Sequence, residues 1–452
     1  MPDDLSLRLT SGLGLVLILL TAWALSSHKA RVPWRVVLGG LGLQIALGLL
    51  FFRTTVGVWF YEATGVVFGT ILASVEEGAK FVFGETYGDH YFAFFVLPSI
   101  VFFGALSAVL EHWGVIPAIV RALGWALQKA LGVSGAESLA AAANVLAGQT
   151  EAPLLIRRYL DRMTDSELMS VMTGGFATVA GGVLVAYYGM GIDPGQLLTA
   201  SLLSAPAALV LAKLMRPETD VPETAGGAAI DRPAAYHNTL DAAAGGAAEG
   251  AKLAINVGAM MLAFLGLIAL VNIILGAAGG AVGLPDLSLE RLLGWAFWPV
   301  AWALGTPIDD CPKVAELLGK KTVLNEFIAY YDLSQLSDED LSPRGRMIAV
   351  YALCGFANLS SVGIQMGALA FLAPNRRASV AALAMKAMVA GTLAAFMTAC
   401  IAGMLADPAE RLIPAEPVPA EPVPAEPVPA EPAREAPDDG ESRQPEAQAE
   451  AE

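Results

Sequence analysis

Apolar segments about as long as a lipid bilayer is thick recur along this chain, and no other feature limits its fold so strongly. A spanning helix needs roughly 20 mostly apolar residues, and in lipid only helices and closed barrels satisfy every backbone group. With 55% hydrophobic and 15% charged residues, the composition is too apolar for an ordinary soluble domain. We therefore predict an all-α polytopic membrane protein with eight transmembrane helices. The predicted spans are residues 13–25, 36–52, 92–110, 168–190, 197–215, 253–275, 347–373 and 378–405.

Two further apolar regions consist of arms that are too short to cross a bilayer, and turn residues interrupt each region. Residues 131–160 contain the run Gly-Gln-Thr-Glu-Ala-Pro at 148–153, and residues 289–325 contain Gly-Thr-Pro at 305–307. A short arm must turn back to the side from which it entered. We therefore predict two re-entrant helical hairpins with these runs at their tips.

Residues 56–83 combine apolar residues at helical spacing with Glu62, Glu76, Glu77 and Lys80. This pattern favours an amphipathic helix that lies along the membrane interface. A charged span that neighbouring helices shield from lipid is the alternative.

Basic residues gather in three turns, at 28–35, 157–162 and 375–377. Cytoplasmic loops carry an excess of Lys and Arg, so we place these turns in the cytoplasm and both termini outside. The formal net charge of −16 does not describe the membrane part, because eleven acidic residues and two arginines follow residue 413. That tail repeats Pro-Ala-Glu-Pro-Val, which predicts a disordered, extended stalk and carries no information about cargo.

Two carboxylates lie in otherwise apolar sequence, Glu151 in the first hairpin and Glu326 after the second. A charge at the bilayer centre costs at least about 2.5 kcal/mol on insertion scales, so each carboxylate is expected to face a wet cavity or a partner. The proposed reason for the cost is a polar ligand. Structural ion pairing with Arg157 or Lys321 is the alternative.

Uncharged donors and acceptors accompany the carboxylates at the interruptions: Gln149, Thr150, Asn358 and Ser361. They suit a neutral ligand that carries amide and hydroxyl groups. Phe356 precedes Asn358 by two residues and could cover a flat ring. Hydrogen bonding between helices, and simple core packing for Phe356, are the alternatives.

A small cation could bind beside these groups. Asn144 and Thr178 offer side-chain oxygens, and the glycine-rich break around Thr178 frees backbone carbonyls, as discontinuous helices of ion-coupled carriers do. Capping of short helix ends is the alternative role for both residues.

Five runs in order resemble the concentrative nucleoside transporters, and the resemblance extends over residues 13–405. The runs are Gly-Gln-Thr-Glu-Ala-Pro-Leu at 148–154, Met-Thr-Gly-Gly through Val-Ala-Gly-Gly-Val at 172–183, Val-Leu-Asn-Glu-Phe at 323–327, Tyr-Ala-Leu-Cys-Gly-Phe-Ala-Asn-Leu-Ser-Ser at 351–361 and Ala-Pro-Asn-Arg-Arg at 373–377.

The resemblance implies a homotrimer in which an inverted-repeat transport domain moves, elevator-like, against a trimeric scaffold. The corresponding division is 1–122 scaffold helices with the interfacial helix; 123–216 first hairpin and transport-domain helices; 217–285 cytoplasmic connector and scaffold helix; 286–406 second hairpin and transport-domain helices; and 407–452 disordered tail.

The resemblance also implies roles for individual residues. The nucleobase edge is read by Gln149, Thr150 and Glu151, the ribose hydroxyls are held by Glu326, Asn358 and Ser361, and the pocket is lined by Phe356 and Val183. The implied sodium ligands are the side chains of Asn144 and Thr178 and the backbone carbonyls of Ala147 and Val179.

The function that we predict is import of nucleosides across a bacterial cytoplasmic (inner) membrane by symport with sodium. A proton-coupled nucleoside symporter is the nearest alternative, and both pyrimidine (uridine-like) and purine nucleosides fit the motifs. An intramembrane enzyme that acts on a nucleotide-like substrate is the alternative from a different class. Because the four histidines, His28, His90, His112 and His237, lie outside the motif runs without metal-ligand spacing, we predict no enzyme and no cofactor besides the coupling ion.

Overall fold

The computed structural model describes residues 2–228, 236–281, 283, 284 and 286–407, and regular secondary structure within these ranges is helical throughout. The predicted Pro-Ala-Glu-Pro-Val stalk lies outside the described residues. The α-helices are α1 (Pro2–Ala24), α2 (Trp34–Arg53), α3 (Thr55–Phe83), α4 (Leu97–His112), α5 (Val115–Leu131), α6 (Gly135–Ala143), α7 (Arg157–Leu160), α8 (Asp165–Ala177), α9 (Gly181–Gly189), α10 (Pro194–Met215), α11 (Thr239–Ala281), α12 (Leu289–Ala303), α13 (Cys311–Val323), α14 (Glu326–Gln335), α15 (Pro343–Leu353), α16 (Leu359–Leu372) and α17 (Arg377–Leu405). Short 3-10 or π segments are η1 (Glu85–His90), η2 (Phe92–Val96), η3 (Ala152–Ile156) and η4 (Pro374–Arg376).

Eight helical stretches among the described residues are long and apolar enough to cross a membrane. They are Asp4–Ala24, Trp34–Arg53, Thr55–Phe83, Phe92–His112, Asp165–Gly189, Pro194–Met215, Thr239–Gly280 and Pro374–Leu405. The number agrees with the prediction, but one member differs. The predicted span 347–373 is present as α15 and α16, which the predicted break separates into helices too short to be counted, and α3 is counted in addition.

The helix α3 covers the segment that we predicted to lie along the interface. It is one helix of 29 residues, and by length and composition it can also cross a membrane. Its interfacial position therefore stays a prediction.

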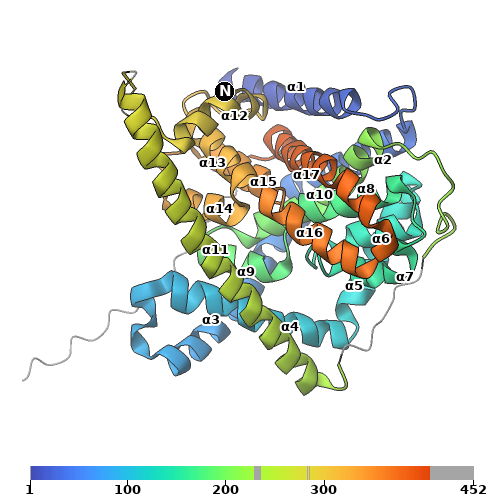
Figure 1. Cartoon of the computed structure of the whole chain (residues 1–452), viewed down its shortest axis with the longest axis horizontal. Helices are drawn as coiled ribbons and strands as arrows, with labels where there is room; N and C mark the ends of the chain where they lie inside the picture. Colours follow the sequence, from blue (N-terminus) through green and yellow to red (C-terminus); the bar gives the residue numbers. More distant parts are fainter. Residues whose placement is uncertain (1, 229–235, 282, 285, 408–452) are drawn as a thin grey trace, which may run out of the picture. The chain divides into compact units, whose positions relative to one another are not determined.

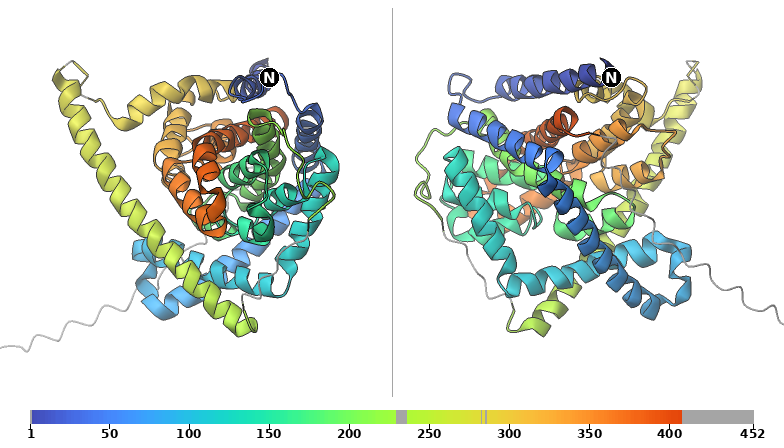
Figure 2. Two further views of the ribbon diagram at one scale, coloured as in Figure 1. Left: turned by 45° about the vertical axis from the view of Figure 1, so that its right-hand side comes forward. Right: turned by 180° about the vertical axis from the view of Figure 1, so that it is seen from behind.

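The buried centre of the molecule is formed by α8, α10 and α17, which pack against one another (Figure 1). In the apolar part of α10, 89% of the residues are buried, whereas the value for α11 is 11%. Figures 1 and 2 show α11 as a long helix that runs diagonally past this centre and crosses α4. The centre is thus shielded by protein, and α11 presents apolar side chains outward, as a lipid-facing or protein-facing helix does.

Both interruptions that the glycine and polar patterns predicted inside apolar segments are present. The first segment is broken between α8 and α9, and the last residue of α8 is Ala177. The second is broken between α15 and α16, where Asn358 caps α16 by accepting a hydrogen bond from Ser361 N. These two predictions are confirmed.

The hairpin turns are also where we predicted them, but only the first one faces the pocket described below. The run at 148–153 follows α6 and leads into η3, whereas Gly305 joins α12 to α13 and packs against α1. A Cβ on Gly305 would lie 2.0 Å from Ser11 Oγ, so this turn is closed against α1. The turn that reaches the pocket is the next one, between α13 and α14, which contains Asn325.

Helices α4 and α11 cross at glycines. A Cβ on Gly246 would lie 2.3 Å from Gly104 O and 2.5 Å from Ala108 Cβ. Gly250 lies one helical turn further along α11. A Cβ on Gly250 would lie 2.8 Å from Ile100 O. Small residues at this spacing let two helix backbones touch, which stabilises helix pairs in membranes.

We expect Gly246→Val to push α11 away from α4, because a branched side chain cannot fit between the two backbones. Overpacking of this kind costs about 1–3 kcal/mol, so thermal unfolding of the detergent-solubilised protein is expected at a lower temperature. The matched control is Gly266→Val on the same helix, since a Cβ there meets no atom within 4 Å. Equal melting temperatures for the two variants would contradict the close crossing.

Candidate functional site

The two broken helices touch each other at their breaks. Phe356 N, in the gap between α15 and α16, donates a hydrogen bond to Thr178 O in the gap between α8 and α9, at 3.2 Å. Gly355 permits this approach, because its φ is +134° and a Cβ would lie 2.7 Å from Phe176 O. A residue other than glycine would be both strained and in collision at this point. The two interruptions therefore form one structural unit.

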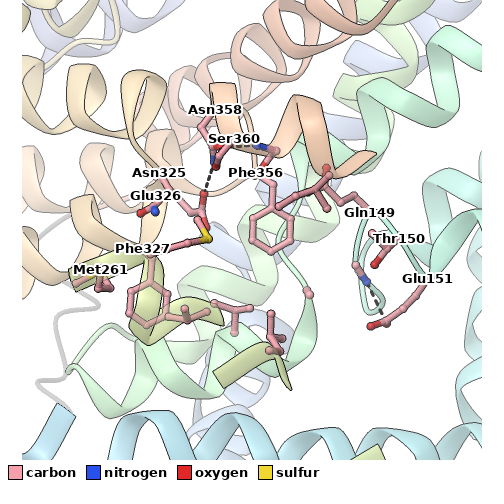
Figure 3. Close-up of a pocket in the computed structure, with 18 residues that line it drawn as sticks. Gln149, Thr150, Glu151, Met261, Asn325, Glu326, Phe327, Phe356, Asn358 and Ser360 are labelled. Carbon is pink, nitrogen blue, oxygen red and sulfur yellow. Dashed lines mark hydrogen bonds between the residues drawn. The ribbon is translucent and has the colours of Figure 1, made fainter. Parts of the chain in front are cut away.

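A pocket opens at this unit, with a cavity volume of about 160 Å³ (Figure 3). Its walls come from the first hairpin, the start of α9, the middle of α11, the turn before α14 and the break before α16. All eight residues predicted to contact the cargo line this one pocket: Gln149, Thr150, Glu151, Val183, Glu326, Phe356, Asn358 and Ser361. Residues separated by more than 200 positions in the sequence thus share one cavity.

The carboxylate of Glu326 is held by two hydrogen-bond donors. Asn358 Nδ2 donates to Glu326 Oε2 at 2.9 Å, and Tyr187 OH donates to Glu326 Oε1 at 3.1 Å. The amide of Asn358 is itself fixed, because its Oδ1 accepts from Ser361 N at 2.8 Å as the cap of α16. Each carboxylate oxygen has further lone pairs, so an oriented acceptor for ligand hydroxyls remains.

Structural ion pairing, the alternative for the two carboxylates, is not found among the described residues. Lys321 Nζ is fully buried and donates to Ala352 O at 2.8 Å, without an ion pair to Glu326. Glu151 Oε2 accepts from Gly148 N at 3.2 Å, and it forms no ion pair with Arg157. Neither carboxylate is paired with Lys321 or Arg157, so both can accept hydrogen bonds from a ligand in the pocket.

Figure 3 shows Phe356 between the two polar ends of the pocket. On one side lie Glu326 and Asn358, and on the other lie Gln149, Thr150 and the exposed Glu151. An aromatic side chain between two hydrogen-bonding ends suits an amphipathic ligand with a flat ring, because the ring can pack on Phe356 while both ends find partners.

The residues predicted to bind a cation adjoin the same break. Asn144 follows the end of α6 and is 1% exposed; its Nδ2 donates to Ala140 O at 3.0 Å, while its Oδ1 has no partner among the described residues. Thr178 Oγ1 donates to Gly174 O at 3.0 Å and keeps its lone pairs. Gly174 adjoins both, since a Cβ on it would lie 3.1 Å from Asn144 Nδ2.

An orphaned buried oxygen beside a helix break fits a small cation with oxygen ligands. Ala147 and Val179, whose carbonyls complete the predicted set, follow Asn144 by three residues and Thr178 by one residue. Within the described part of the chain, no cluster of His, Cys, Asp or Glu side chains could hold a metal ion. The predicted cation ligands are therefore all neutral oxygens, two from side chains and two from backbone carbonyls.

Several residues of the pocket lining were not among the predicted site residues, and neither was Tyr187, which donates to Glu326 without lining the pocket itself. Tyr187 lies in an apolar run, Asn325 caps α14, and Met260 and Met261 come from α11. No periodicity or motif marks Tyr187 or the α11 residues, because each has the composition of an ordinary span. Asn325 had a signal, since a cap residue directly precedes Glu326 at an interruption.

Comparisons with protein families give three adjacent matches along the chain. Residues 13–86 match the family model described as Na+ dependent nucleoside transporter N-terminus, residues 93–193 match the one described as nucleoside recognition, and residues 196–403 match Na+ dependent nucleoside transporter C-terminus. Together these matches include every predicted site residue.

Proteins similar to this chain include named carriers. Solute carrier family 28 member 3 of Mus musculus is 44% identical over 409 residues, which cover 87% of this chain and 58% of the relative. Sodium/nucleoside cotransporter 1 of Rattus norvegicus is 40% identical over 417 residues, covering 89% of this chain and 64% of the relative. The chain thus spans about three fifths of the length of these relatives, which are named as transporters rather than as enzymes.

Solved structures of CNTnw resemble this fold over nearly their whole length. The inward-facing, substrate-bound state has a TM-score of 0.82 and 42% sequence identity, and the match covers 88% of this chain and 98% of that one. A doubly substituted CNTnw in an outward-facing state gives a TM-score of 0.85 and 41% identity, with 88% and 99% coverage.

Proposed function

Because the chain belongs to the family of Na+ dependent nucleoside transporters, we propose that it is a secondary active transporter that imports nucleosides by symport with sodium. The observation that carries this proposal is the convergence of all eight predicted cargo residues on one pocket where two broken helices meet. Secondary carriers place their cargo sites at such interruptions.

In the proposed binding mode the two ends of the pocket recognise the two parts of a nucleoside. Glu326 accepts hydrogen bonds from ribose hydroxyls, with Asn358 and Ser361 beside it. Gln149, Thr150 and Glu151 hydrogen-bond the edge of the base, and Phe356 and Val183 pack against its faces. The donors to Glu326 support this mode, because they orient the carboxylate before the cargo arrives.

Sodium is the coupling ion that we propose, with the side chains of Asn144 and Thr178 and the carbonyls of Ala147 and Val179 as its ligands. The unpartnered Asn144 Oδ1 supports this assignment. A bound sodium ion would be the positively charged partner that Asn144 Oδ1 lacks. Thr178 O also accepts the hydrogen bond from Phe356 N, so an ordered break at Thr178 holds Phe356 at the pocket wall.

Asn144→Ala is expected to raise the sodium concentration for half-maximal uptake by about ten- to a hundredfold, because one ligand oxygen is lost. Initial rates of uptake into liposomes, measured over a series of sodium concentrations, test this. The exposed Asn375→Ala is the matched control, expected to leave the sodium dependence unchanged. An unaltered sodium dependence in Asn144→Ala would remove the residue from the ion site.

We further propose an elevator-like alternating access in which the hairpins and the broken helices move as one domain against a scaffold within a homotrimer. Relatives of this fold solved in inward-facing and outward-facing states support the alternation. The helices α1 and α2, which the predicted division assigned to the scaffold, pack against α17 and α10 of the predicted transport domain. We therefore propose that these two helices travel with the moving domain, and that α3, α4 and α11 are the scaffold.

We propose that the chain lies in the cytoplasmic (inner) membrane of a bacterium, and that both termini lie outside because the basic turns lie in the cytoplasm. Arg376 supports the cytoplasmic position of the turn before α17, because it pairs with Asp165 at 2.8 Å and so joins two turns of the same predicted side.

The function is tested by uptake of radiolabelled uridine and adenosine into liposomes that contain the purified chain. An inward sodium gradient is expected to drive accumulation above the outside concentration, and replacement of sodium by choline at fixed pH is expected to abolish it. Accumulation that follows an imposed proton gradient in choline would instead favour proton coupling, and recovery of a chemically altered nucleoside would favour an enzyme.

A further inference from the structure

Two buried glutamine side chains meet behind the base-reading end of the pocket. Gln149 lies in the first hairpin, and Gln365 lies on α16, 1% exposed and outside the pocket lining. Gly175 of α8 lets them approach: a Cβ at this position would lie 2.5 Å from Gln365 Nε2 and 2.8 Å from Gln149 Cβ. The two side chains therefore adjoin the same point of α8.

The amide of Gln365 has a defined orientation. Its Nε2 donates to Met172 O at 3.0 Å, and the reversed amide would set oxygen against oxygen there. Its Oε1 is consequently fixed, and this oxygen is buried without a donor. A buried acceptor without a donor is costly, so a neighbouring donor that turns toward it when the ligand binds is a physical explanation for its presence.

Gln149 has the same deficit, but its amide also carries the N–H donors that Gln365 Oε1 lacks. Its Oε1 is also buried without a partner, although the residue lines the pocket and is 6% exposed. A glutamine amide carries two N–H donors and one acceptor oxygen. One N–H of Gln149 can satisfy Gln365 Oε1, which leaves the other N–H and Oε1 for the cargo.

Resting on the proposed function, we propose that Gln365 is the positioning residue that selects the nucleobase. Its Oε1 accepts a hydrogen bond from the Gln149 amide in the loaded state and thereby fixes which way round Gln149 presents its oxygen and its nitrogen. Gln365 touches no cargo atom and acts through Gln149 alone.

The chemistry of the bases makes this orientation decisive. Uracil and hypoxanthine present a ring N–H beside a carbonyl oxygen, whereas cytosine and adenine present a bare ring nitrogen beside an amino group. A free amide can turn over and match either pattern, because it carries a donor and an acceptor side by side. An amide held by Gln365 matches only one of them, so the chain discriminates between keto and amino nucleosides.

The test is the ratio of uptake efficiencies, Vmax/KM, for uridine against cytidine and for inosine against adenosine, measured with the full chain in liposomes. The wild type is expected to favour one member of a pair by about three- to tenfold, the value of one hydrogen bond. Gln365→Met is expected to bring that ratio to within about twofold of unity. Gln365→Leu replaces it in the same assay should the methionine variant fail to fold.

Gln44→Met is the matched control, because Gln44 is an equally buried glutamine far along the chain, on α2. Its Nε2 likewise donates to a backbone carbonyl, Leu203 O at 2.9 Å, and its Oε1 is likewise without a partner. A purely structural loss lowers Vmax in both variants and leaves both ratios as in the wild type.

Equal ratios in Gln365→Met and in the wild type, or a wild type without preference in either pair, would overturn the inference. A wild type that takes up none of the four nucleosides would overturn the proposed function itself. These outcomes are distinct, since the first two require measurable wild-type uptake.

Discussion

Replacement of Glu326 by glutamine is expected to lower uptake efficiency by roughly 10²- to 10⁴-fold. The carboxylate accepts hydrogen bonds from Asn358 Nδ2 and Tyr187 OH and keeps lone pairs toward the pocket. A glutamine amide supplies one acceptor oxygen and turns the other position into a donor, which faces either Asn358 or Tyr187. The two hydrogen bonds that we propose from the ribose hydroxyls lose their charged acceptor, and each such bond is worth about 1.5–3 kcal/mol.

Vmax/KM for uridine and adenosine in liposomes measures this effect. Glu339→Gln is the control, because Glu339 is exposed in the loop before α15 and the charge change is the same. The melting temperature of Glu326→Gln is expected to stay near that of the wild type, since removal of a buried charge offsets the lost bonds. A loss of uptake efficiency smaller than about threefold, no more than an ordinary surface substitution causes, would exclude Glu326 from the cargo site.

The second large effect concerns stability. Lys213, at the end of α10, is an ion-pair partner of Glu137 at 2.8 Å and of Glu218 at 3.1 Å, and its exposed fraction is 5%. Glu137 belongs to the capping box of α6 and is 1% exposed, so Lys213 joins the first hairpin to α10. We expect Lys213→Met to lower the free energy of unfolding by about 3–5 kcal/mol, because it leaves a buried carboxylate without its counter-charge.

Thermal unfolding in detergent measures this loss of stability. Lys313→Met is the reference variant, because it removes an exposed ion pair instead of a buried one. Lys313 pairs with Asp340 at 2.7 Å, but the two side chains are 39% and 44% exposed, so this pair is worth about 1 kcal/mol at most. The double variant Lys213→Met, Glu137→Gln is expected to recover part of the stability. If Lys213→Met and Lys313→Met unfold at the same temperature, the buried ion pairs of Lys213 do not stabilise the first hairpin.

The membrane class and the helix breaks could be predicted because each has a local physical cause. Apolar length determines the spans, and glycine pairs or polar residues inside such runs determine the interruptions at Thr178 and Asn358. The same reasoning found Glu151 and Glu326, since an isolated carboxylate in lipid is too costly to be incidental.

What escaped prediction depends on contacts between distant segments. Tyr187 orients Glu326 across 139 positions, and Gln365 meets Met172 across 193. Neither has a sequence signal, because a tyrosine or a glutamine in a span also serves as ordinary packing or as a hydrogen bond between helices. The turn at Gly305 shows the same limit: its residues predict a turn but not which surface covers it.

The membrane position of α3 also cannot be read from its sequence. Its 29 residues are apolar enough to span and contain enough carboxylates to lie at an interface. Only packing against neighbours and lipid distinguishes the two positions, and both fit the same pattern.

The central claim is that polar residues at the paired breaks bind a nucleoside in a manner that depends on sodium. Isothermal titration of uridine and adenosine into the purified chain, in sodium and in choline at one pH, tests it most directly. At least one nucleoside is expected to bind saturably in sodium, about 5- to 150-fold more weakly in choline, and not measurably to Glu326→Gln. Equal affinities in the two salts, or undiminished binding to Glu326→Gln, would contradict it.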